Sequence, residues 1–302
     1  MTVEDPLEPV EPQTLHVQVL ALTDGEVRNG QYTSSYLVQR RPAGTTPHST
    51  DPKVHTLAVD AGCLGFLGAP RQQRDIRHIL LTHAHLDHIA SLPVFLENVY
   101  EPGPDAPTVH ASRATLDALQ AHLFNGVVWP DFIGMSNAEN AFVHTRVLEP
   151  GQTVGIDGFR VEAVAVDHVV PTQAYVIEAG RPDAPPETPT VVFAADSGPT
   201  RDLWASVRSG GRTPVLAFVE ASFPSTMRAL AELSKHLTPQ MLSAEIAGLP
   251  GYTQVVVVHV KPRYLPEITA EVAALGAARP GLALAEPGRW LEVAPPTRAT
   301  GG

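Results

Sequence analysis

Residues 83–88, with the sequence HAHLDH, carry the residue types and spacing that most clearly suit metal chemistry. Imidazole and carboxylate groups are ligands for Zn²⁺, and also for Mn²⁺ or Fe. A turn that leaves a strand can point alternate side chains into one cavity, so His83 and His85 could share one ion. Asp87 and His88 could then face a second ion. The other interpretation is a solvated polar turn, although such a pattern arises by chance only on the order of a few times in a thousand.

Several expected strands end directly in histidine or aspartate. Asp60, His83, His168, Asp196 and His259 each follow a short β-rich run. Strand ends that lie side by side at one sheet edge are where α/β folds keep their polar sites. Five such residues in one chain therefore predict a shared site. Taken one at a time, each could be an ordinary polar residue at the end of a strand.

Short β-rich runs alternate with helical runs along most of the chain. Strands are expected at residues 15–22, 35–39, 56–59, 78–81, 161–166, 174–178, 191–195, 215–219 and 255–258. Helices are expected at residues 91–100, 113–123, 200–208, 225–234, 239–247 and 266–277. Early hairpins that give way to β–α alternation predict an α/β sandwich, in which helices cover paired sheets. We expect a single domain over residues 1–302, with frayed tails at about 1–13 and 295–302.

Composition narrows the class of protein. The net charge of −11 repels phosphate backbones, so a nucleic-acid partner is not favoured. No run approaches the roughly 20 apolar residues that cross a bilayer, and the acidic N-terminus is unlike a signal peptide. We therefore expect a cytoplasmic protein without a membrane partner. An anionic substrate still fits if bound metal ions supply positive potential locally.

The HxHxDH pattern of residues 83–88 resembles the signature of the metallo-β-lactamase superfamily. Superfamily members place further ligands at later strand ends, and His168, Asp196 and His259 match these ligands in order. The resemblance implies a four-layer αββα sandwich with two divalent metal ions, best matched by Zn²⁺, with Mn²⁺ or Fe as alternatives. One ion would bind to His83, His85 and His168, and the other to Asp87, His88 and His259, with Asp196 bridging both.

Segments further along the chain resemble the class II cyclic-nucleotide phosphodiesterases. The matching segments are residues 85–92, 122–132, 166–175, 220–224, 236–239 and 259–262. This resemblance implies hydrolysis of 3′,5′-cyclic AMP or cyclic GMP to the 5′-monophosphate by a hydroxide that bridges the two metal ions. The expected partner is therefore a small-molecule cyclic nucleotide. Related proteins often dimerise, which admits a homodimer.

Other functions fit the same ligand set. The tRNA 3′-processing endonucleases share it, together with a histidine resembling His236, but they carry a basic arm for which this sequence offers no candidate. Hydrolysis of another phosphoester or ester is a related alternative. A non-catalytic metal-binding scaffold is a third interpretation, which the complete ligand set disfavours. Class B β-lactamases use a cysteine downstream of the motif, whereas Cys63 lies upstream of it.

The resemblance also implies catalytic roles for Asp87 and His236. Asp87 would hold metal and orient the nucleophile, and His236 would stabilise the phosphate or protonate the leaving oxygen. The alternative for His236 is an exposed residue that caps the helix beginning near Pro239.

Five further residues have less specific candidate roles. Asp60 and Glu220 close strands, and each could hold a ligand histidine by its second ring nitrogen or could cap a loop. Asn125 could hydrogen-bond the base or ribose. Lys261 could contact phosphate or lie on the surface as a solvated lysine. Phe124 could stack on the base, although a large aromatic residue is more often part of the core.

Overall fold

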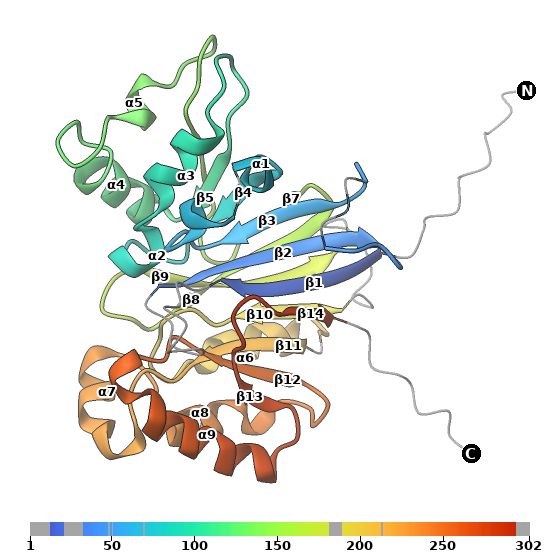
Figure 1. The fold of residues 1–302 in the computed structure, drawn as a ribbon. Helices are drawn as coiled ribbons and strands as arrows, with labels where there is room; N and C mark the ends of the chain where they lie inside the picture. The colour runs from blue at the N-terminus through green and yellow to red at the C-terminus, as the bar shows by residue number, and fades with distance from the viewer. Residues whose placement is uncertain are drawn as a thin grey trace, which may run out of the picture.

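Two sheets of seven strands each stack face to face, with helices on both outer faces (Figure 1). This computed structural model describes residues 13–20, 33–47, 49, 51–68, 70–180, 189–212 and 214–293. The layer order is the αββα arrangement that the sequence predicts. The tails expected to fray, 1–13 and 295–302, lie outside the described residues except for Gln13, where the first strand begins.

The first sheet has the strand order β14-β1-β2-β3-β4-β5-β6. Its strands are β1 (Gln13–Leu20), β2 (Ser35–Pro42), β3 (His55–Val59), β4 (Ile76–Leu80), β5 (Thr108–Ala111), β6 (His144–Val147) and β14 (Trp290–Val293). Pairing is antiparallel from β14 to β3 and parallel from β3 to β6. On its outer side lie η1 (Leu64–Phe66), α1 (Pro70–Gln73), α2 (Leu86–Ile89), α3 (Leu92–Val99), α4 (Arg113–His122) and α5 (Phe132–Met135).

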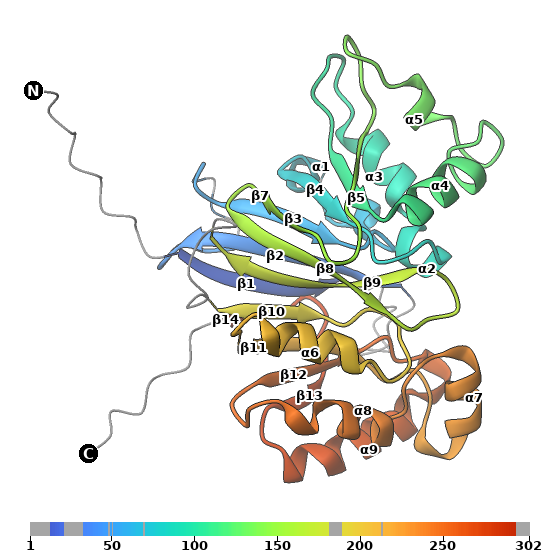
Figure 2. The same cartoon turned by 180° about the vertical axis from the view of Figure 1, so that it is seen from behind.

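The second sheet has the order β13-β12-β11-β10-β9-β8-β7. Its strands are β7 (Thr153–Ile156), β8 (Phe159–Val166), β9 (Thr172–Ala179), β10 (Thr190–Phe193), β11 (Pro214–Glu220), β12 (Gln254–Val258) and β13 (Leu282–Leu284). Figure 2 shows the helices that cover its outer face from behind. These are α6 (Arg201–Ser209), α7 (Arg228–Ser234), α8 (Pro239–Glu245) and α9 (Leu265–Ala278), with the short turns η2 (Ser225–Met227), η3 (Ile246–Gly248) and η4 (Pro262–Tyr264).

Apolar side chains hold the layers together. Side chains on successive strand residues point to opposite faces, so a strand covered on both faces is mostly apolar, and its buried polar side chains need partners. All eight residues of β9 are buried, for example. Between the sheets, Tyr36, Phe193 and Phe218 pack with ring centroids 4.9 to 5.4 Å apart. Each fully buried residue of this size contributes about 1.5–3 kcal/mol relative to an exposed one.

The predicted elements are present, with their ends shifted by up to three residues. The prediction missed β5, β6, β7, β13, β14 and the short helices α1, α2 and α5. These are brief elements, and β6 has no buried residue, so no hydrophobic alternation marked it. Among the described residues, no helix combines the length and the apolar content needed to cross a bilayer.

Several strands bring their carboxyl ends to the same edge of the sandwich. In the first sheet, β3 and β4 are parallel. In the second, β10, β11 and β12 are parallel, and β8 runs the same way because β9 is antiparallel to both β8 and β10. At three of these ends the backbone is left-handed, with φ of 58° at Asp60, 58° at Ala195 and 53° at His259. Such strained residues cost about 1–3 kcal/mol each and cluster at functional sites.

Candidate metal centre

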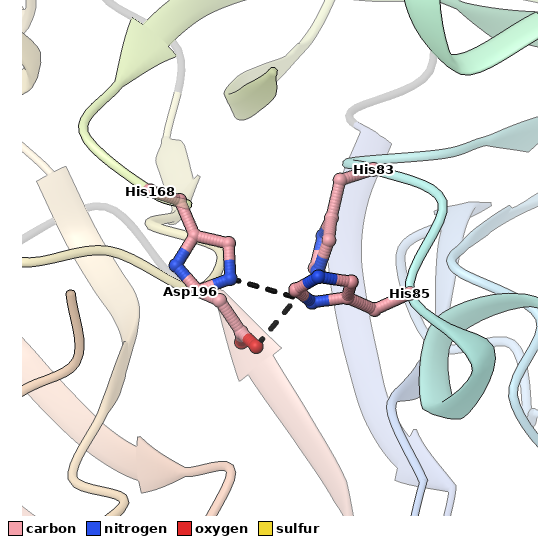
Figure 3. A group of neighbouring side chains, drawn as sticks. All are labelled: His83, His85, His168 and Asp196. Carbon is pink, nitrogen blue, oxygen red and sulfur yellow. Dashed lines mark hydrogen bonds and ion pairs between the residues drawn. The ribbon is translucent and has the colours of Figure 1, made fainter. Parts of the chain in front are cut away.

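Four side chains from three loops converge at this edge (Figure 3). They are His83 and His85 after β4, His168 after β8 and Asp196 after β10. One potential ligand atom from each lies within 4.8 Å of the others. His168 Nε2 is 3.4 Å from His85 Nδ1, and His83 Nε2 is 3.9 Å from Asp196 Oδ2. Atoms this close can surround one cation, because nitrogen and oxygen ligands bind Zn²⁺ at about 2.0–2.2 Å.

A second group shares Asp196 with the first. It adds Asp87 and His88 from α2 and His259 from the end of β12. His259 Nε2 lies 3.0 Å from Asp87 Oδ2 and 3.2 Å from Asp196 Oδ2. His88 Nε2 lies 3.3 Å from the same Asp196 oxygen. The structure therefore brings together all seven residues that the sequence singled out as metal ligands, in two groups joined by one carboxylate.

Two buried nitrogen atoms test whether these residues suit metal ions. The Nε2 atoms of His83 and His88 are buried and have no hydrogen-bond partner among the described residues. The approach of Asp196 to His88 Nε2 lacks hydrogen-bond geometry. Leaving a buried polar atom unsatisfied costs about 1–3 kcal/mol. A cation in each group would use these lone pairs, so the donor set fits divalent metal ions.

The electrostatics of the cluster favour cation binding. Burial lowers the pKa of His83, and neighbouring histidines lower it further, so its ring stays neutral as a metal ligand must. Burial opposes protonation of His88, but Asp196 and Asp60 outweigh it and raise the pKa of His88. Burial likewise opposes ionisation of Asp196, but His259 and His88 hold its pKa well below the usual range. This buried carboxylate is therefore ionised and attracts positive charge, which a metal ion can supply in place of protons.

On the first sheet, Asp60 anchors His88. Its Oδ2 accepts a hydrogen bond from His88 Nδ1 at 2.7 Å. Its Oδ1 accepts from the backbone N–H of Thr82 at 2.8 Å and from the Thr82 hydroxyl at 3.0 Å. A carboxylate on Nδ1 fixes the proton there and leaves the Nε2 lone pair for a metal ion.

On the second sheet, Glu220 accepts four hydrogen bonds. Oε1 accepts from His236 Nδ1 at 2.7 Å and from the backbone N–H of Ser197 at 2.9 Å. Oε2 accepts from the Ser222 hydroxyl at 2.6 Å and from the backbone N–H of Leu237 at 3.2 Å. These donors occupy the acceptor positions of a carboxylate, which has about four. Glu220 therefore acts as an anchor for its neighbours.

His236 lies beside both groups. Its side chain is buried, and its ring centroid is 5.0 Å from that of His168 and 5.3 Å from that of His259. Thr238 caps α8 instead, so the interpretation of His236 as an exposed helix cap is wrong. Glu220, His236 and His259 are also close enough to hold a cation, but the Glu220 oxygens are already engaged.

The loop that carries His236 also holds His168. His168 Nδ1 donates to the carbonyl oxygen of Lys235 at 3.0 Å, and Lys235 Nζ donates to Asp167 Oδ1 at 2.6 Å. Lys235 has a left-handed backbone with φ of 53°. Sequence reasoning missed Lys235, Thr82 and Ser222 in these positioning roles. The available signal was that each one adjoins, or lies two residues from, a predicted site residue.

The predicted substrate contacts lie outside these groups. The Asn125 side-chain oxygen accepts from two backbone N–H groups of its own exposed loop, at 3.0 and 2.8 Å. Lys261 Nζ lies 5.5 Å from the ring centroid of Phe223. Phe124 is 1% exposed and belongs to the core beneath α4, so its face is not available for stacking on a base.

The chain is similar to phosphodiesterases and to ribonucleases of known sequence. Residues 70–177 match the family described as class-II cAMP phosphodiesterases. A probable 3′,5′-cyclic-nucleotide phosphodiesterase of Yersinia pestis is 24% identical over 214 residues, covering 64% of this chain and 59% of the relative. Ribonuclease TTHA0252 of Thermus thermophilus is 32% identical over 127 residues, covering 41% of this chain and 27% of the relative. The matched part is thus less than two thirds of either relative.

Solved structures share the architecture of most of the chain. Unliganded yeast PDE1 has a TM-score of 0.69 at 20% identity, covering 93% of this chain and 99% of that one. The metallo-β-lactamase fold protein YhfI of Bacillus subtilis has a TM-score of 0.63 at 16% identity, covering 92% and 99%. Likeness at such identities establishes the fold. The protein has the metallo-β-lactamase fold, as the HxHxDH motif implied, and it resembles the class-II cyclic-nucleotide phosphodiesterases.

Proposed function

We propose that this protein is a binuclear metal-dependent phosphodiesterase that hydrolyses 3′,5′-cyclic nucleotides to 5′-monophosphates. The observation that carries the proposal is the pair of ligand groups that share Asp196. The Nε2 atoms of His83 and His88, which lack hydrogen-bond partners within the described part of the chain, support it. The match of residues 70–177 to class-II cAMP phosphodiesterases supports the substrate class.

The two groups would each hold one ion. The first ion would be held by His83, His85 and His168 and the second by Asp87, His88 and His259, with Asp196 bridging both. Five imidazoles and two carboxylates suit Zn²⁺ best, with Mn²⁺ or Fe as alternatives. When bound, the ions would lower the pKa of a water between them and offset charge on the phosphoryl oxygens.

The side chains around the groups would direct the reaction. Asp87 is 38% exposed at its side chain and would orient the attacking water. The attacking water would lose one proton to solvent, its oxygen would bond to phosphorus as the bond from phosphorus to the 3′ oxygen breaks, and the 5′-monophosphate would remain. His236 would give the leaving oxygen its proton from Nε2, since Nδ1 is bonded to Glu220.

A metal-reconstitution assay tests the proposal. The protein is stripped with a chelator and reloaded with Zn²⁺ or Mn²⁺, and metal content and hydrolysis of cyclic AMP and cyclic GMP are measured together. We expect two ions per chain, activity only after reloading, and the 5′-monophosphate as product. A protein that holds two ions and yields no 5′-monophosphate from either nucleotide would exclude this function.

Hydrolysis of RNA is the second candidate, which the similarity to Ribonuclease TTHA0252 favours. The net charge of −11 opposes it, because RNA binding depends on neutralising phosphates. Faster turnover of precursor tRNA than of cyclic nucleotides would support the ribonuclease. Tight binding of both ions without turnover of either substrate, or of a generic phosphodiester, would support a metal-binding scaffold.

A further inference from the structure

Ser222 contacts both Glu220 and His259, and so connects Glu220 to the second ligand group. The residue is fully buried, at 0% exposure. Its hydroxyl oxygen lies 2.6 Å from Glu220 Oε2, 2.7 Å from His259 Nδ1 and 3.0 Å from the His259 carbonyl oxygen. Neither Ser222 nor this connection is part of the metal-ligand set.

The position of the Ser222 hydroxyl proton decides which group donates in each of these hydrogen bonds. A serine hydroxyl has one proton to donate and can accept from other donors. An ionised carboxylate only accepts, and short bonds to it are the strong ones, so the proton points to Glu220 at 2.6 Å. The 2.7 Å contact with His259 Nδ1 must then be a bond that the ring donates to Ser222. The ring therefore carries a proton on Nδ1, and in its neutral form, which a metal ligand requires, the lone pair is on Nε2.

The Nε2 atom faces the second ligand group, where it bonds Asp87 when protonated and would bind a cation when the ring is neutral. His259 Nε2 lies 3.0 Å from Asp87 Oδ2 and 3.2 Å from Asp196 Oδ2. At Nδ1, His88 bonds the Asp60 carboxylate directly, whereas His259 reaches the Glu220 carboxylate through the Ser222 hydroxyl. Hydrogen bonds that follow one another polarise each other, so the charge of Glu220 strengthens the ring as a metal donor.

We propose that Ser222 is a positioning residue that fixes His259 in its metal-binding tautomer and thereby sets cation affinity in the group of Asp87, His88 and His259. This inference rests on the proposed function for the presence of a cation pair. It also makes Glu220 serve two purposes, because the same carboxylate holds His236 directly and His259 through the hydroxyl. Occupancy of the second cation position is thus linked to the proposed proton donor.

The test is a competition titration of Zn²⁺ against a chromophoric chelator, which resolves two binding steps per chain. Ser222→Ala should raise the Kd of one step by about 10–100-fold and leave the other unchanged, as expected when a partner behind a ligand is lost. The matched control is Thr253→Val, which removes another fully buried hydroxyl at the opposite end of β12, bonded to the carbonyl oxygen of Pro214 at 2.7 Å. Both steps should be unchanged in that variant.

Two further variants separate positioning from folding. Ser222→Thr keeps the hydroxyl and should restore the affinity of the weakened step. Glu220→Gln keeps the shape of the anchor but removes its charge, so it should weaken the same step and also lower kcat through His236. In Ser222→Ala with Zn²⁺ in excess, kcat should recover towards the wild-type value with KM unchanged. Thermal unfolding of the stripped variants reports whether each one folds.

The outcomes distinguish this inference from the proposed function. If the wild type binds two ions and Ser222→Ala binds both with unchanged affinity, the role of Ser222 is overturned and the proposed function is not. Equal weakening of both steps, or the same loss in Thr253→Val, would also overturn it, because the effect would be general. Wild-type protein that cannot bind two ions overturns the proposed function together with this inference.

Discussion

The two sides of the candidate metal centre, one formed by each sheet, hold their histidines by different means. On the side formed by the first sheet, Asp60 binds the ring of His88 directly at 2.7 Å. On the side formed by the second sheet, Glu220 binds His236 directly and reaches His259 only through Ser222. The direct hydrogen bond from His88 to Asp60 positions a single predicted metal ligand. A relay through a hydroxyl lets one carboxylate position a ligand and a proposed proton donor together.

Substitution of Asp196 should have the largest effect on metal binding and activity, because this residue belongs to both ligand groups. Asp196→Ala should abolish metal pairing and lower kcat/KM by more than about 10⁴-fold, about 5.5 kcal/mol of transition-state stabilisation. Metal analysis and the cyclic-nucleotide assay, carried out on the same preparation, measure both effects. Retained activity would contradict the assignment of Asp196 as a bridge.

Substitution of His236 should affect only the side of the site that the second sheet forms. His236→Ala should lower kcat by about 10²–10³-fold, the usual contribution of a general acid, while both ions stay bound. Kinetics together with metal content per chain measure this. Because the ring is held by Glu220 and is outside the two cation groups, a large loss of metal would mean that His236 is a ligand.

Asp60 tests the direct pair. Asp60→Asn removes the charge behind His88 and should raise the Kd of the second cation by about 10–100-fold. The same step should weaken as in Ser222→Ala, since His88 and His259 belong to one group. Chelator competition on the two single variants and the double variant measures this. If the two variants weaken different cation-binding steps, Asp60 and Ser222 act on different ions.

His110, which has no carboxylate on its ring, gives the smallest expected effect. Burial, helped by the charges of His78 and Arg146, lowers the pKa of His110 to about 4. The unfolded chain therefore takes up this proton first as pH falls from about 6.5 to 4, and stability declines. From pH 7 to 5, the stripped wild type should lose about 1–2 kcal/mol more than His110→Gln.

Urea denaturation at both pH values measures the difference. Equal losses in the two proteins would show that the ring is not held neutral in the fold. The cation affinities of His110→Gln should match the wild type, since the ring bonds His78 and not the metal centre.

Much of this architecture could be predicted from sequence because its signals are local. The apolar runs of β9 and β12 and the HxHxDH motif each lie within a few residues. Elements without such a signal were missed, as with the exposed strand β6 and the single-turn helix α2. Phe124 lies in the core, which is the more usual position of a large aromatic residue, and not in a base contact.

By itself, the sequence determined the residue types of the centre and their order along the chain, since chemistry and strand periodicity are written in neighbouring residues. The tertiary structure alone decided which of them touch. Ser222 and His259 are 37 residues apart, and they meet because parallel pairing sets Glu220 beside Val258. A hydrogen bond requires positions correct to a few tenths of an ångström. Only the register of packed strands supplies that precision.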